Sequence, residues 1–387
     1  MQRILLKDAT IFSMAGPVLE DSDLLIEEGK IAAVGKSIDG EGAKSIDLSG
    51  KFITPGFIDA HCHIGLFEDS LGFEGDDGNE MTDPVTPQLR AIDAIYPTDR
   101  TFDEALAAGV TVAITGPGSA NVIGGQFAAV KTFGRTVEEK LLSAPVAMKI
   151  AFGENPKRVY HGQRKSPSTR MATASILREA LFKAKEYMEK KETAAGNSEK
   201  TPAFDLKWEA LIPVLKREIP LKAHAHRADD IMTAIRIAEE FGLRITLDHC
   251  TEGHLIADLL AAKGLPAIVG PSFSDRSKVE LRNLTFETPG ILAKAGVKIA
   301  IMTDSPVIPS QYLPLCAKLA VRNGLDAQEA LKAITINPAE IVGIANRVGS
   351  LEAGKDADLV VFDRHPLAFE AEVEMVFING KRVVSRE

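Results

Sequence analysis

Pairs of histidines separated by one residue occur twice in the sequence, each time at the end of an apolar segment. His61 and His63 end PGFIDAHCH, and His224 and His226 end IPLKAHAH. Because successive side chains of a strand point to opposite faces, the two imidazoles of each pair would share one face. Such a pair can bind a divalent cation, although a pair on its own also arises by chance.

Two further side chains of types that can bind a metal ion lie at the ends of other apolar segments. His249 follows LRITLD, and Asp304 follows VKIAIMT. Five of the eight histidines of the chain therefore lie at the ends of predicted strands. A buried structural histidine explains any one of them, whereas five such residues together with an aspartate favour a metal centre.

Lys149 lies inside the apolar segment VAMKIAF, between Met148 and Ile150. A buried ammonium group is costly to desolvate, so this lysine needs a carboxylate partner, a lowered pKa or chemical modification. A neutral amine can take up carbon dioxide and become a carbamate, whose two oxygens can bridge two metal ions. The alternative is an ion pair with an acidic residue on a neighbouring strand.

The segment between Pro55 and about Ala345 alternates short apolar strands with amphipathic helical patterns. Repeated strand–helix units predict parallel strands, and about eight of them over ~250 residues predict an α/β fold, the (β/α)8 or TIM barrel. Enzymes of this architecture carry their chemistry at the carboxyl ends of the strands, where the histidines and the aspartate would meet. The predicted strands include residues 111–115, 146–152, 221–226, 245–250, 267–270 and 298–305.

The two ends of the chain show a different pattern of short alternating strands and turns, with an Asn-Gly hairpin signal near the C-terminus. We predict that residues 1–54 and 346–387 pair into one small β-sandwich domain beside a metal-binding barrel of residues 55–345. Two unrelated β appendages are the alternative. Residues 161–205 predict a loop and a charged helix, with an active-site lid at the front of this insertion.

The composition argues against several classes of function. The 387-residue chain has a formal net charge of −9 and no basic stripe, so neither nucleic acid nor an anionic membrane is an expected partner. No apolar segment has the length of a membrane span, and the first residues become polar too early for a signal peptide. The expected partner is a small-molecule substrate, and assembly into a homo-oligomer stays open. The chain has only three cysteines, Cys62, Cys250 and Cys316, so a disulfide framework is not expected. This favours a location in the reducing cytoplasm.

Over nearly its whole length the chain resembles the metal-dependent amidohydrolase superfamily, in the branch of imidazolonepropionase-like hydrolases and related dipeptidases. The motif GKFITPGFIDAHCH is similar to the signature of the family's first barrel strand. The motif NPAEIVGIANRVGSLEAGKDADLVVFD is similar to the family's return from the barrel to the small domain. The resemblance implies a TIM barrel whose metal ligands are His61, His63, Lys149, His224, His249 and Asp304.

Two positions depart from the family pattern. Glu154 could supply a metal-binding carboxylate in place of Lys149, as glutamate does in some relatives. His226 stands where many relatives carry an acidic residue. We therefore predict that His226 contacts the substrate or supports the ligands.

The resemblance implies hydrolysis of a C–N bond in an amide, a cyclic amide or a peptide. Zinc suits the mixture of imidazole and oxygen ligands. The chain would bind one or two zinc ions, and a carbamate on Lys149 would be present if it binds two. A metal-activated hydroxide would be the nucleophile, and Asp304 would act as the general base. The alternatives are an imidazolonepropionase-type cyclic amide hydrolase, a deaminase and a non-catalytic binding relative.

Cationic residues on two loops at the active-site face favour a substrate that bears a carboxylate. A planar arginine side chain can bind a carboxylate with two hydrogen bonds. The glycine-rich segment 116–126 could add backbone N–H groups near that carboxylate, or could form only a tight turn. The predicted contacts are Tyr160, His161, Arg164 and Arg282, and the same two loops also carry Arg158, Arg276 and Lys278.

Overall fold

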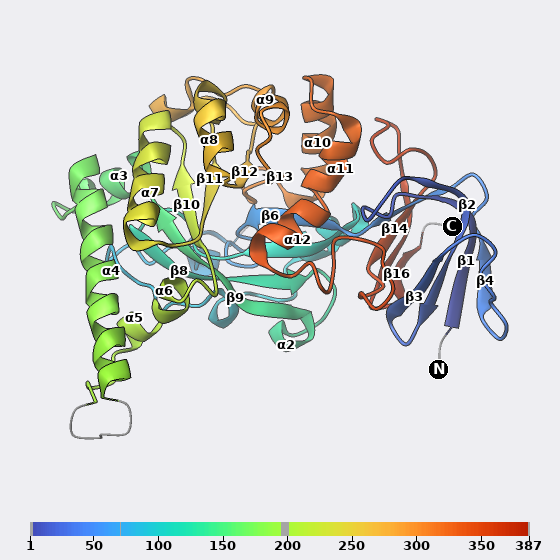
Figure 1. The fold of residues 1–387 in the computed structure, drawn as a ribbon, viewed down its shortest axis with the longest axis horizontal. Coiled ribbons are helices and arrows are strands. Elements are labelled where there is room, and N and C mark those ends of the chain that lie inside the picture. Colours follow the sequence, from blue (N-terminus) through green and yellow to red (C-terminus); the bar gives the residue numbers. More distant parts are fainter. Residues whose placement is uncertain (1–2, 70, 195–200, 386–387) are drawn as a thin grey trace.

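Two eight-stranded sheets form the framework of the computed structural model, which describes residues 3–69, 71–194 and 201–385. The first sheet forms a barrel in the middle of the molecule, and the second sheet lies beside it (Figure 1). Each barrel strand pairs with the next one in the sequence. The barrel strands are β6 (Phe57–Cys62), β7 (Val110–Thr115), β8 (Ile123–Lys131), β9 (Leu141–Ala151), β10 (Leu221–Ala225), β11 (Ile245–His249), β12 (Ala267–Val269) and β13 (Ile299–Ile301).

Backbone hydrogen bonds connect the first and last strands of the barrel beyond their carboxyl ends. The N–H of Asp304 donates to the carbonyl of His61 at 3.0 Å, and the N–H of His63 donates to the carbonyl of Ser305 at 2.8 Å. These bonds bring the predicted ligands that follow β13 next to those of β6. The predicted α/β fold of the TIM-barrel type is therefore present in its main features.

Strand β8 runs against its neighbours, which corrects the prediction that the barrel strands are parallel. β8 pairs antiparallel with β7 and with β9, whereas the other neighbouring strands are parallel. Residues 116–122 are too short for a helical crossover, so the strand that follows has to return. The glycine-rich segment therefore includes the start of β8. Gly124 suits this position because a Cβ there would lie 3.2 Å from Cγ of Lys149.

Helices pack around the barrel, and helices follow each of the strands β10, β11, β12 and β13 (Figure 1). The helices of the long insertion are described below. Among the described residues, no helix combines the length and the apolar character that crossing a membrane requires. Short 3-10 turns are η1 (Gly72–Gly75), η2 (Ala91–Asp93), η3 (Gly253–Ile256), η4 (Val279–Leu281) and η5 (Ser310–Tyr312). The helices are α1 (Arg100–Ala107), α2 (Val137–Lys140), α7 (Ala228–Phe241), α8 (Ala257–Lys263), α9 (Thr288–Lys294), α10 (Leu313–Arg322), α11 (Ala327–Ala333) and α12 (Ile336–Val342).

The connection between β9 and β10 contains the insertion predicted at residues 161–205, of which residues 195–200 lie outside the described residues. The predicted charged helix is α4, which extends away from the barrel (Figure 1). Its N-cap is Thr169, whose hydroxyl accepts from the N–H of Ala172 at 3.1 Å. A lid at the front of the insertion stays a prediction. The helices of this connection are α3 (Glu154–Gly162), α4 (Arg170–Thr193), α5 (Leu206–Glu209) and α6 (Ile212–Leu215).

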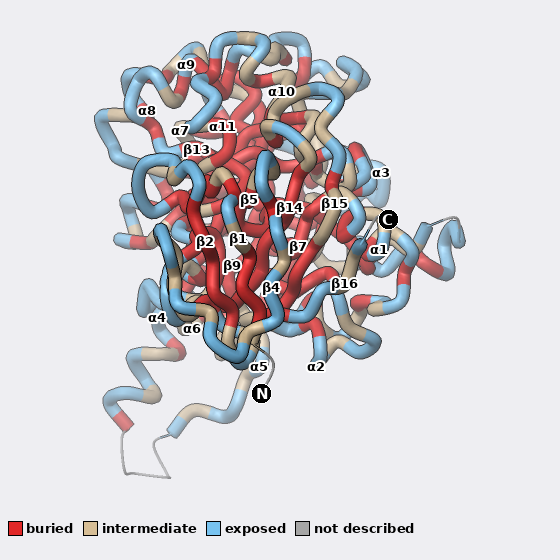
Figure 2. The backbone as a smooth tube through the Cα atoms, turned by 90° about the vertical axis from the view of Figure 1, so that its right-hand side faces the viewer, coloured by how far each residue is buried: buried red, intermediate tan, exposed pale blue. Residues whose placement is uncertain are grey.

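The second sheet contains strands from both ends of the chain. β14 pairs antiparallel with β5, and this pairing links the C-terminal strands to the N-terminal ones. Figure 2 shows that β1, β2 and β14 are largely buried. The sandwich arrangement and the domain boundaries near residues 54 and 346 stay predictions. The strands are β1 (Arg3–Ile11), β2 (Leu19–Glu27), β3 (Lys30–Gly35), β4 (Lys44–Asp47), β5 (Phe52–Pro55), β14 (Leu359–Phe362), β15 (Val373–Ile378) and β16 (Lys381–Ser385).

Candidate metal centre

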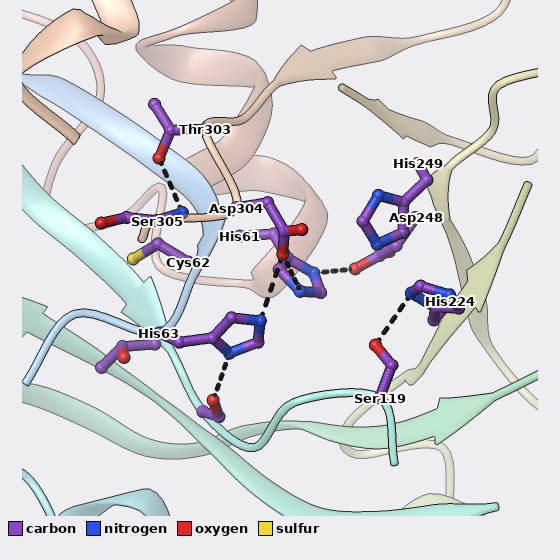
Figure 3. Close-up of polar contacts among 12 residues, drawn as sticks. His61, Cys62, His63, Ser119, His224, Asp248, His249, Thr303, Asp304 and Ser305 are labelled. Atoms are coloured by element: carbon purple, nitrogen blue, oxygen red, sulfur yellow. Dashed lines mark hydrogen bonds and ion pairs between the residues drawn. The ribbon is translucent and has the colours of Figure 1, made fainter. Parts of the chain in front are cut away.

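A cavity of about 300 Å³ lies at the carboxyl ends of the barrel strands. Figure 3 shows the side chains of His61, His63, His224, His249 and Asp304 gathered close together, and all but His61 line the cavity. Two sets of side chains offer ligand atoms that lie within 4.8 Å of one another, and both sets include His249. The first set is His224, His226 and His249, and the second is His61, His249 and Asp304.

Nδ1 of each of the five histidine rings lies within hydrogen-bond distance of an oxygen atom. Nδ1 of His63 lies 2.6 Å from the carbonyl oxygen of Gly116, and Nδ1 of His249 lies 2.9 Å from that of Gly270. Because a carbonyl only accepts, Nδ1 of each ring carries a hydrogen, and the lone pair of a neutral ring is then on Nε2. Metal-binding histidines usually donate their second ring N–H in this way. The remaining Nδ1 partners are Asp248 for His61, Ser119 for His224 and Thr251 for His226.

Burial favours the neutral form of three of these imidazoles. Loss of water lowers the pKa of His61, His224 and His249 well below the ordinary histidine value. The neutral ring is the form that binds a metal ion. Nε2 of His249 is buried and has no hydrogen-bond partner among the described residues. A divalent ion would satisfy this nitrogen, so the residues present fit a metal.

Asp304 is held in place by a buried network behind it. Its backbone has φ of 55°, in the left-handed region, and its carboxylate Oδ1 lies 3.1 Å from Nε2 of His63. The preceding residue, Thr303, donates its N–H and its hydroxyl to the carboxylate of Asp59, which also accepts from Ser310 at 2.9 Å. Burial raises the pKa of Asp59 to about 6. This network fixes the backbone from which Asp304 projects.

Lys149 and Lys222 lie opposite each other on β9 and β10, and both are fully buried. Nζ of Lys222 lies 2.9 Å from Oδ2 of Asp248, whereas Nζ of Lys149 lies 3.1 Å from Nε2 of His61. In the part of the chain that the structure describes, Lys149 forms no ion pair. The alternative of an ion pair for Lys149 is therefore wrong, because the neighbouring acid pairs with Lys222. Burial lowers the pKa of Lys149 to about 8, so a neutral amine is accessible.

Glu154 lies at the first position of α3, and its backbone N–H donates to the carboxylate of Glu280 at 2.9 Å. Its side chain is about a third exposed and lies 3.9 Å from Arg158. Within the described residues Glu154 neither lines the cavity nor joins a ligand set. The structure thus brings Lys149, and not Glu154, to the histidines.

Most of the predicted substrate contacts lie away from the cavity. The hydroxyl of Tyr160 is buried and donates to Asn121 at 2.6 Å. His161 and Arg164 are exposed at the end of α3, and Arg282 is exposed next to Glu252. His226 does line the cavity. Lys278, one of the further cations of these loops, also lines the cavity, as do Ser119 and Asn155, which were not predicted.

We expect Lys222→Met to lower the free energy of unfolding by ~3–5 kcal/mol, because it leaves the carboxylate of Asp248 buried without its cation. Chemical denaturation of the metal-free protein measures this loss. The double variant Lys222→Met, Asp248→Asn should recover part of it, since the amide removes the unpaired charge. A single variant as stable as the native chain would show that the pair is not needed for stability.

Comparisons with known proteins identify the family and support the fold. The model of the amidohydrolase family matches residues 52–383. The chain is 31% identical to "Amidohydrolase tasK" of Hapsidospora irregularis over 92% of its own length, but it spans only 39% of that relative. It is 24% identical to an imidazolonepropionase of Thermoplasma acidophilum, covering 95% of this chain and 90% of that one. The crystal structure of an amidohydrolase from Thermotoga maritima is 48% identical, with a TM-score of 0.96 over 99% of this chain and 100% of that one.

Proposed function

The chain belongs to the amidohydrolase family, and from this premise we propose that it hydrolyses a C–N bond of a small, carboxylate-bearing substrate with the help of a divalent metal. One observation carries the proposal. Five buried imidazoles have their Nδ1 atoms bonded to oxygen partners beside the carboxylate of Asp304. Such a set of imidazole ligands with one carboxylate suits zinc.

The proposed ligands divide between the two sides of the cavity. His61, His63 and Asp304 would hold an ion on one side, and His224 and His249 would hold an ion on the other. Lys149, as a carbamate, would bridge the two sides. Its lack of an ion pair among the described residues and its lowered pKa support this modification.

A bound divalent ion would supply Lewis acidity, which lowers the pKa of water toward ~7 and polarises a carbonyl. The protein then has to move one proton. The carboxylate of Asp304 accepts it from the attacking water and returns it to the leaving nitrogen. The buried Asp59 network keeps Asp304 in position for both transfers.

The polar wall of the cavity supports a substrate with a carboxylate. Nζ of Lys278 donates to Oδ1 of Asn155 at 2.9 Å, and Nδ2 of Asn155 lies 3.4 Å from Nε2 of His224. A cation therefore lies one side chain away from a proposed metal ligand. A carboxylate close to the scissile amide, as in an N-acyl amino acid or a dipeptide, would reach both groups.

The substrate class is tested by a panel assayed with the zinc-loaded protein. The panel contains N-acyl amino acids, dipeptides, their C-terminal amides, imidazolone propionate and adenine. We expect the carboxylate-bearing amides to be hydrolysed fastest. Faster turnover of imidazolone propionate or adenine would instead identify a cyclic amide hydrolase or a deaminase.

Lys278→Met should raise KM for carboxylate-bearing substrates by roughly 10–100-fold, since a hydrogen bond to a charged group contributes ~1.5–3 kcal/mol. Methionine keeps most of the apolar stem, so the loss reports on the charge. The same substitution should change KM for C-terminal amides only slightly. Arg282→Met is the matched control, because this exposed cation of the same loop lies outside the cavity. Equal KM changes for acids and amides would remove Lys278 as the anchor.

A further inference from the structure

His226 belongs to the cavity as fully as the predicted ligands beside it. Its ring centroid lies 4.8 Å from that of His224 and 4.4 Å from that of His249. All three rings are almost completely buried, and their ligand atoms lie within 4.8 Å of one another. We propose that His226 is a third imidazole ligand on the side of the metal centre formed by His224 and His249. The inference rests on the proposed metal centre and extends it.

The hydrogen bonds of the three rings support this role. Nδ1 of His226 lies 2.7 Å from the hydroxyl of Thr251, as Nδ1 of His224 lies 2.8 Å from that of Ser119. Nδ1 of His249 is bonded to a backbone carbonyl. With every Nδ1 engaged, the three Nε2 atoms are the ligand atoms that remain.

A buried carboxylate next to His226 supplies a second, independent observation. Oε1 of Glu280 lies 3.7 Å from Nε2 of His226 and has no hydrogen-bond partner among the described residues. The other oxygen of Glu280 accepts from the N–H of Glu154. A buried carboxylate oxygen without a partner is costly. A divalent cation on the three imidazoles would lie close to this carboxylate and reduce that cost.

The proposed trio has a consequence for Lys149. Three imidazoles can hold an ion without a carbamate, because structural and catalytic zinc sites need only three or four protein ligands. The His224 side should therefore keep its ion when Lys149 is replaced. Loss of the carbamate and loss of His226 thus have separate effects.

The nitrogen resonances of the native sequence test the coordination directly. The full chain is labelled with ¹⁵N in its histidine rings, freed of metal with a chelator and titrated with zinc. We expect Nε2 of His226, assigned from the spectrum of His226→Gln, to shift together with those of His224 and His249. If His226 keeps its metal-free resonance at zinc saturation while the other two shift, the inference is overturned.

Zinc affinity, measured by competition with a chelator, separates a ligand from a supporting residue. We expect His226→Gln to weaken one zinc equivalent by more than the ~10–100-fold that is typical for loss of an outer-shell partner. Thr251→Val removes only the Nδ1 partner and should stay within that range. His254→Gln is the matched control, since this partly buried histidine is bonded to Thr288 outside the cavity.

The outcomes distinguish the inference from the proposed function. A native chain that binds no zinc would remove both. Unchanged affinity in His226→Gln, with normal zinc binding by the native chain, would overturn only the role of His226. Equal effects of His226→Gln and Thr251→Val would also overturn it, because they would assign His226 to support and not to coordination.

Discussion

Asp304→Asn is expected to abolish turnover while leaving the fold intact. The amide cannot accept the proton of the attacking water, and the general-base contribution alone is typically ~10²–10⁴-fold. The loss of one charged metal contact should add to this, so we expect kcat to fall by at least ~10⁴-fold in total. The backbone of residue 304 should remain in place, because the bonds from Thr303 to Asp59 do not involve its side chain. Steady-state kinetics with a measured metal content checks the prediction.

The control for this variant is another carboxylate of the same cavity. Asp275 lines the cavity but belongs to neither ligand set, so Asp275→Asn should change kcat only a few-fold. Circular dichroism and thermal unfolding confirm that both variants are folded. Near-normal kcat in Asp304→Asn at normal metal content would mean that a different residue acts as the base.

Lys149→Met should cost the protein its bridging ligand and nearly all of its turnover. Methionine has a similar volume and no amine, so the apolar packing is kept while the carbamate cannot form. We expect the variant to lose one metal equivalent, by elemental analysis, and to retain the ion held by the histidines of β10 and β11. In the native, zinc-loaded chain, ¹³C-bicarbonate should give a carbamate resonance that Lys149→Met lacks.

Two controls accompany the Lys149 variant. Lys140→Met replaces another buried lysine, far from the ligand sets and bonded to the carbonyl of Thr132, and should keep its carbamate resonance and metal content. Glu154→Gln tests the remaining carboxylate and should have no effect on metal content. Full metal content and turnover in Lys149→Met would contradict the carbamate, and a loss in Glu154→Gln would transfer the ligand role to Glu154.

The sequence allowed the convergence of the ligands to be predicted because it follows from a general rule. Side chains at the carboxyl ends of parallel strands meet on one face of a barrel. His61, His224, His249 and Asp304 each follow an apolar segment, so their positions needed no knowledge of the loops. The reversal of β8 was not predictable in the same way, because its glycines resemble a turn.

Which of the two buried lysines pairs with Asp248 depends on the register of three strands. Lys222 and Lys149 are aligned across β9 and β10, while Asp248 of β11 pairs with Lys222. The sequence alone does not reveal this register, so it does not show that Lys222 competes with Lys149 for the carboxylate of Asp248. Most of the predicted substrate contacts were wrong for a similar reason. The loop after β12 turns Lys278 inward and leaves Arg282 exposed, which depends on the loop's own packing.

The metal content of the untagged protein, purified without chelators, tests the central claim most directly. Elemental analysis should find more than one equivalent of divalent transition metal per chain, mainly zinc, if both sides of the cavity are filled. Removal of the metal should abolish hydrolysis, and added zinc should restore it. Active protein that contains no transition metal, and that keeps its activity in the presence of a strong chelator, would contradict the account.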